Sequence, residues 1–342
     1  MTRHLLDVDD LLPGELDEVL AAAGRHDLAP VLAGGGVAMV FEKPSARTRN
    51  ATEMAVVGLG GHPVHIVGSE LGIGAREPVG DVARTLACYH RVICARVADH
   101  RTLVGMAEAL DGAGVPVPVV NLLSDLAHPG QAVADLLTLR DAFGAGGLTG
   151  RTVAYLGDAN NVCRSLAKAA SVAGMEVRVA SPPGYGFDPA EVGELAAAAG
   201  RAGRGGTVRS MPDPRQAADG AHAIYTDVWA SMGQEGEAAR RRQAFAGYSV
   251  DEALVALAAP DAVVLHCLPA HRGEEIAASV VDGPRSRVWA QAAHRLTAMR
   301  GLLWWLAGRA GTRAGTSAGT SAGTRAGTSA GTRAGTSAAE GT

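Results

Sequence analysis

The segment Val37-Ala38-Met39-Val40-Phe41-Glu42-Lys43-Pro44-Ser45-Ala46-Arg47-Thr48-Arg49 joins a short apolar run, a turn and the start of a helix. The apolar run predicts a buried strand, and a helical pattern continues over residues 51–57. The free amide groups of a first helical turn bind anions, and the two hydroxyl and two guanidinium groups of this segment suit phosphate oxygens. We therefore predict a strand–loop–helix unit with a phosphate site. A capped helix with two solvated arginines explains this segment equally well.

Length and composition restrict the class of protein. A chain of 342 residues that is 47% hydrophobic predicts about two domains with substantial cores. The net charge of -4 argues against a nucleic-acid partner, and the absence of an apolar run of about 18 residues argues against a membrane protein. The N-terminus turns acidic before a signal-peptide core could form, so we expect a cytoplasmic protein.

Cysteine and histidine spacing indicates neither a disulfide framework nor a metal centre. The four cysteines lie far apart, without a C-x-x-C pair, as expected for reduced thiols. The eleven histidines show no helical i, i+4 pair beside a glutamate. We therefore predict that the protein binds no metal.

Short apolar runs alternate with helical stripes along most of the chain. This alternation predicts an α/β fold of two domains, each a parallel sheet flanked by helices, with linking helices between them. A glycine-rich passage at residues 143–150 marks the boundary. The expected domains are 1–145, completed by a C-terminal helix at 292–307, and 146–291. The Ala-Gly-Thr repeats of 309–342 contain no large apolar residue, so we expect a disordered tail.

Polar residues follow several predicted strands, at the sheet edge where α/β proteins bind ligands. They are Arg96, the segment 128–131, the pair Asn160 and Asn161, Asp227, and the segment 266–273. Each has a plain structural alternative, such as a surface histidine, a helix cap at Asp227 or an inert buried thiol at Cys267. The turn after Gly157 lacks the G-x-G-x-x-G pattern, which argues against dinucleotide binding.

Six motifs together resemble the ornithine carbamoyltransferases, within the aspartate/ornithine carbamoyltransferase family. The resemblance covers about residues 5–307 and implies the two-domain fold of that family. The motifs are FEKPSARTR (41–49), DVAR (81–84), HPGQ (128–131), GDANN (157–161), DVWASMG (227–233) and HCLPAHRG (266–273). The last two resemble the ornithine enzymes rather than the aspartate enzymes.

The resemblance implies transfer of the carbamoyl group of carbamoyl phosphate to the δ-amine of L-ornithine, without a cofactor, as in arginine biosynthesis. The residues implied for carbamoyl phosphate are Ser45, Ala46, Arg47, Thr48, Arg49, Arg96, His128, Gln131 and Arg295. Those implied for ornithine are Asn161, Asp227, Ser231, Met232, Cys267 and Leu268. The implied catalytic group is Arg96, His128, Cys267 and Arg295. The family also implies a homotrimer with sites shared between subunits.

The chain departs from the family pattern at a few positions. Ala46 replaces a threonine but keeps the backbone amide, Gly130 replaces a threonine or cysteine, and His294 replaces an asparagine. The loop 68–77 lacks the glutamine that the family directs into the neighbouring subunit. Two alternatives stay open: a carbamoyltransferase for another amine, such as acetylornithine or putrescine, and a catalytically silent paralogue. Asp227 with Ser231 and Met232 favours free ornithine.

Overall fold

The computed structural model describes residues 2–144, 147–230 and 235–317, and within these ranges the strands form two parallel sheets. The four-stranded sheet has the order β2-β1-β3-β4, and the five-stranded sheet has the order β7-β6-β5-β8-β9. The strands are β1 (Gly36–Phe41), β2 (His62–Val67), β3 (His90–Arg96), β4 (Val119–Leu123), β5 (Thr152–Leu156), β6 (Glu176–Ala180), β7 (Thr207–Met211), β8 (Ala223–Thr226) and β9 (Val263–His266).

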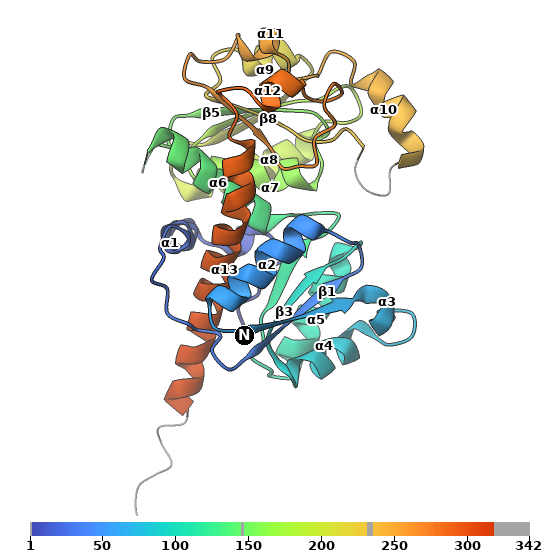
Figure 1. Ribbon diagram of the computed structural model, residues 1–342, viewed down its shortest axis with the longest axis vertical. Helices are drawn as coiled ribbons and strands as arrows, with labels where there is room; N and C mark the ends of the chain where they lie inside the picture. The colour runs from blue at the N-terminus through green and yellow to red at the C-terminus, as the bar shows by residue number, and fades with distance from the viewer. Residues whose placement is uncertain (1, 145–146, 231–234, 318–342) are drawn as a thin grey trace, which may run out of the picture.

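Helices flank both sheets, which confirms the predicted fold class (Figure 1). They are α1 (Pro13–Ala23), α2 (Ala46–Gly58), α3 (Gly68–Leu71), α4 (Val79–Ala87), α5 (His100–Gly112), α6 (Pro129–Phe143), α7 (Asn161–Val172), α8 (Pro189–Ala202), α9 (Pro214–Ala218), α10 (Ala238–Ala244), α11 (Glu252–Val255), α12 (Ala278–Val281) and α13 (Val288–Ser317), with 3-10 helices at Val8–Asp10 and Glu235–Glu237. No helix in the described ranges has the length and apolarity to cross a membrane.

Strand pairing brings the candidate site residues to one edge of each sheet. Phe41 of β1 lies opposite Arg96 of β3, and the Glu42 amide donates to the Arg96 carbonyl, so the loop that leads to α2 begins beside Arg96. In the second sheet Thr226 of β8 lies between Leu156 of β5 and His266 of β9. The turns that follow these three strands therefore emerge side by side, as parallel strands require.

Two helices connect the halves of the molecule. The long helix α13 packs against α1, α2 and α6 beside the first sheet and also contacts β9 of the second (Figure 1). Helix α6 packs in turn against α7. Helix α6 begins directly after His128, and α13 carries Arg295. The helices that join the two halves therefore also position two of the candidate site residues.

Two parts of the chain differ from the sequence-based expectation. Strand β7 was not predicted, because its polar residues Thr207, Arg209 and Ser210 weaken the apolar pattern of an edge strand. Helix α13 is continuous and passes Arg309, where we expected the disordered tail to begin. The preceding apolar turns have already nucleated the helix, and the alanines and arginines of the first repeats extend it despite their glycines, which have low helix propensity. The rest of the expected tail, 318–342, lies outside the described residues.

Candidate active site

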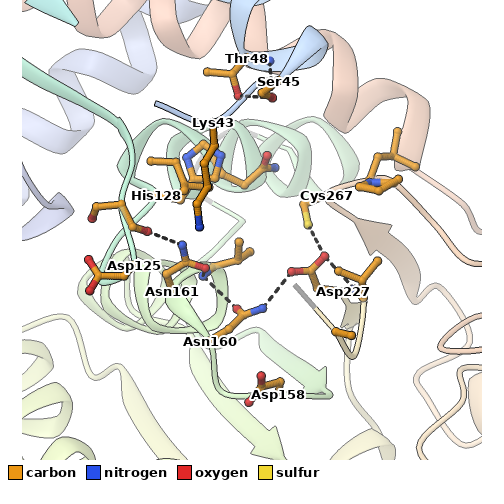
Figure 2. A pocket seen from close by; sticks show the side chains of 18 of the residues that line it. Lys43, Ser45, Thr48, Asp125, His128, Asp158, Asn160, Asn161, Asp227 and Cys267 are labelled. Atoms are coloured by element: carbon orange, nitrogen blue, oxygen red, sulfur yellow. Dashed lines mark hydrogen bonds between the residues drawn. The ribbon is translucent and has the colours of Figure 1, made fainter. Parts of the chain in front are cut away.

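A cleft of about 1430 Å³ lies between the two sheets, and both halves of the chain line it. Figure 2 shows Lys43, Ser45 and Thr48 from the loop and helix after β1 on one side of the cleft. Asp227 and Cys267 face them from the turns after β8 and β9. The cleft therefore combines the two groups of residues that the motifs single out.

The first helical turn of α2 forms one end of the cleft. Ser45 is the N-cap, and its Oγ accepts a hydrogen bond from the Thr48 backbone amide at 3.4 Å. Arg295 reaches this turn from α13 and donates from Nη2 to the Thr48 Oγ1 at 2.8 Å. Amides of a first helical turn and nearby guanidinium groups favour an anion here.

Three arginines concentrate positive charge at this end. Burial lowers the pKa of Arg96 to about 10, and repulsion from Arg295 and Arg47 adds to the shift. Burial also lowers the pKa of Arg295, with repulsion from Arg47 contributing. Arg96 Nε is buried and has no hydrogen-bond partner among the described residues. A dianionic phosphate would neutralise this charge and supply acceptors for the guanidinium groups.

His128 enters the same region immediately before α6. Its backbone amide donates to the Ser165 Oγ at 2.8 Å, which fixes the start of the helix. Burial lowers the pKa of the imidazole well below its usual value, and the nearby charges of Arg295 and Arg96 lower it further. His128 is therefore neutral at physiological pH, and its ring nitrogen Nδ1 has no partner in the described part of the chain.

The opposite wall centres on the carboxylate of Asp227, which is buried. Its Oδ2 accepts from the Asn160 Nδ2 at 3.0 Å, and its Oδ1 accepts from the Cys267 Sγ at 2.9 Å (Figure 2). Burial raises the pKa of Cys267 well above its usual value, and the Asp227 charge adds to the shift. Cys267 is therefore a neutral thiol, which is a weak nucleophile.

The turn after β9 is strained at Leu268, next to Cys267. Leu268, which follows it, has a φ of 61°, in the left-handed region that non-glycine residues rarely occupy. The Leu268 amide donates to the His266 Nδ1 at 2.9 Å, and the His266 Nε2 lies 3.1 Å from the Glu275 Oε1. This fully buried pair supports the turn and directs Leu268 to the cleft lining.

Most of the expected site residues lie in the cleft. Of the residues implied for the two substrates, the lining includes Ser45, Ala46, Arg47, Thr48, Arg96, His128, Gln131, Asn161, Asp227, Cys267, Leu268 and Arg295. Asn161 lines it with an amide that donates to the Ser124 carbonyl at 2.5 Å, whereas the neighbouring Asn160 contacts Asp227.

Other expected residues do not join them. Arg49 is absent from the described lining, and its Nε forms an ion pair with the Glu53 Oε1 at 2.8 Å on the exposed face of α2. This i, i+4 pairing explains the difference, because residues two positions apart on a helix, such as Arg47 and Arg49, do not share a face. Ser231 and Met232 lie outside the described residues. None of the residues 68–77 lines the cleft within the described ranges.

Some lining residues were not selected from the sequence. Lys43 extends into the cleft from the first motif (Figure 2). Arg241 donates to the Asp158 Oδ2 at 2.6 Å on the wall formed by the second half. Asp158 belongs to the GDANN motif and could have been selected from it. Arg241 is the middle one of three consecutive arginines, and the run does not indicate which of them faces the cleft.

Comparisons with known proteins agree with this arrangement. The family model for the carbamoyl-P binding domain of aspartate/ornithine carbamoyltransferases matches residues 3–141, and the model for the Asp/Orn binding domain matches 149–306. The chain is 50% identical to an ornithine carbamoyltransferase of Acidothermus cellulolyticus, over 92% of this chain and 99% of that protein. It is 47% identical to one of Thermus thermophilus, over 89% and 96%. The solved ornithine carbamoyltransferase of Pyrococcus furiosus has a TM-score of 0.83 at 40% identity, covering 90% of this chain and 97% of that one.

Proposed function

The chain belongs to the aspartate/ornithine carbamoyltransferase family and acts as an ornithine carbamoyltransferase, and we propose how its own residues divide the reaction between them. The δ-amine of L-ornithine attacks the carbonyl carbon of carbamoyl phosphate, and the products are L-citrulline and phosphate. The observation that supports this assignment is the cleft itself. A cluster of three arginines faces a wall that carries a carboxylate and amides.

Carbamoyl phosphate occupies the arginine-rich end in this proposal. The first turn of α2 holds the phosphate through Ser45, Thr48, Arg47 and the Ala46 amide, which the replacement of a threonine leaves intact. Domain 1–145, completed by the C-terminal helix, supplies these contacts, and domain 146–291 supplies the ornithine site.

The same end stabilises the transition state. Attack on the carbonyl carbon develops negative charge first on the carbonyl oxygen and then on the departing phosphate. Arg96, Arg295 and the neutral imidazole of His128 lie at this end of the cleft and donate to these oxygens. One donor of this kind contributes about 2.7–4 kcal/mol in comparable enzymes.

Ornithine binds against the second wall. Asp227 pairs with the α-ammonium group, Asn161 contacts the α-carboxylate, and Cys267 and Leu268 border the δ-amine. The proposal assigns ligand contacts to Ser231 and Met232 through the family pattern alone. The Cys267 thiol excludes water beside the amine and forms no covalent intermediate, because its raised pKa keeps it protonated.

The assembly is a homotrimer in this proposal, with sites shared between cytoplasmic subunits that serve arginine biosynthesis. Exposed apolar side chains support association, because a subunit interface would bury them. Met54 and Val57 on α2 are 54% and 53% exposed in the single chain, and Val67 at the end of β2 is 42% exposed. Light scattering coupled to size exclusion should give three times the mass of one chain.

Product analysis with three amines tests the reaction. Purified enzyme is given carbamoyl phosphate with L-ornithine, N-acetyl-L-ornithine or putrescine, and each carbamoylated product is quantified. The proposal predicts citrulline as the dominant product. Preferential carbamoylation of either alternative amine contradicts it, as does binding of carbamoyl phosphate without formation of any product.

A further inference from the structure

Behind the cleft lies a fully buried carboxylate, Asp135, which the reaction described above does not use. It follows Gln131 by four residues on α6, so both side chains lie on the same face of the helix. The Gln131 Nε2 donates to the Asp135 Oδ1 at 2.8 Å. The Gln291 Nε2 of α13 donates to the same oxygen at 2.7 Å.

This contact determines which end of the Gln131 amide faces the cleft. The Asp135 Oδ1 accepts from both amides, so it faces the NH2 group of Gln131 and not the Gln131 carbonyl oxygen. Gln131 lines the cleft, and its Oε1 is buried without a partner among the described residues. An unpaired buried acceptor is costly, so a ligand group that donates to the Gln131 Oε1 would relieve this cost.

We infer that Asp135 is a positioning residue that fixes the Gln131 carbonyl oxygen towards the carbamoyl NH2. Through this contact the enzyme selects carbamoyl phosphate over acyl phosphates that lack an amino group. This inference rests on the proposed function. Acetyl phosphate has a methyl group where carbamoyl phosphate has NH2, so it leaves the Gln131 Oε1 without a donor. A rotated amide would direct its own NH2 at the carbamoyl NH2 and remove this preference.

Asp135 also belongs to a network that extends into the second half of the molecule. The Gln291 Oε1 accepts from the His266 backbone amide at 2.9 Å, and the Gln291 Nε2 lies 3.1 Å from the Tyr225 hydroxyl. A purely structural role of Asp135 would act through these contacts. The Gln291→Met variant disturbs them and leaves the contact between Gln131 and Asp135 intact, so it separates the two roles.

The test measures the ratio between the inhibition constant of acetyl phosphate and the KM of carbamoyl phosphate, in citrulline formation. Asp135→Leu removes the acceptor and keeps the branched shape of the side chain, whereas Asp135→Asn keeps an acceptor oxygen. We expect the ratio to fall at least about 10-fold in Asp135→Leu, through a higher KM for carbamoyl phosphate, and to stay within about 3-fold of the parent in Asp135→Asn and Gln291→Met.

An unchanged ratio in Asp135→Leu overturns the inference, and so does an equal fall in Gln291→Met. If Asp135→Leu gives no folded protein, Asp135→Ala replaces it with the same expectations, because it also removes the acceptor. Calorimetric binding of carbamoyl phosphate and acetyl phosphate yields the same ratio without turnover. Absence of citrulline in the parent enzyme would contradict the proposed function, and the binding ratio would still decide the role of Asp135.

Discussion

Arg295 donates from its Nη2 to the Thr48 Oγ1 at 2.8 Å, which joins the last long helix to the phosphate end of the cleft across 247 residues of sequence. Both residues line the same cleft. Helix α13 therefore contributes to the site as well as to the packing of the two halves.

Replacement of Arg295 should affect activity more than stability. Arg295→Met keeps the apolar part of the side chain and removes a buried cation and a donor. We expect kcat/KM for carbamoyl phosphate to fall at least about 100-fold. Steady-state kinetics measure this, with circular dichroism as the check on folding. A fall of less than about 5-fold in folded protein would remove Arg295 from the site.

The pH profile should reflect the amine and not His128. Because burial and nearby arginines lower the pKa of His128, the imidazole stays neutral from pH 6 to 9 and gives no inflection there. The ornithine δ-ammonium must lose a proton before attack, so kcat/KM for ornithine should rise with pH across this range. A flat profile would contradict rate-relevant deprotonation of the amine.

Replacement of Cys267 distinguishes a covalent from a direct transfer. Cys267→Ser keeps a donor to the Asp227 Oδ1, which now accepts from the thiol at 2.9 Å. Since we assign no covalent step to this thiol, the variant should keep citrulline formation within about 100-fold of the parent. Loss of activity beyond about 10⁴-fold, the scale of a missing nucleophile, would argue for a covalent intermediate.

Because of Asp135, the free energy of unfolding should decrease as the pH rises. Burial raises the pKa of this carboxyl from 3.8 to about 7, against the hydrogen bonds from Gln131, Gln291 and Tyr225. The folded state therefore binds more protons than the unfolded state between about pH 4 and 7, and the free energy of unfolding decreases through this window. Asp135→Asn removes this contribution. Its stability relative to the parent should increase from pH 5 to 8 in urea denaturation, and a constant difference would contradict the shift.

Sequence patterns predicted the two parallel sheets and most of the cleft because apolar strands and the residues after them are local features. Arg96 and Asp227 were found in this way, since Arg96 ends the buried strand β3 and Asp227 directly follows the buried strand β8. The network of Asp135 and Gln291 could not be predicted, because its residues come from helices separated by 156 positions. The position of Arg49 outside the described cleft lining could not be predicted for a similar reason, since the motif does not specify which arginine faces the cleft. The polar edge strand β7 lacked a sufficient apolar signal.

Citrulline formation by Arg47→Ala and Arg49→Ala, measured beside the parent enzyme, tests the central claim most directly. The two arginines lie two positions apart on α2, but Arg47 lines the cleft and Arg49 pairs with Glu53 outside it. The account predicts that Arg47→Ala loses at least about 100-fold in kcat/KM while Arg49→Ala stays within about 5-fold. Equal losses in the two variants, or a fully active Arg47→Ala, would contradict it.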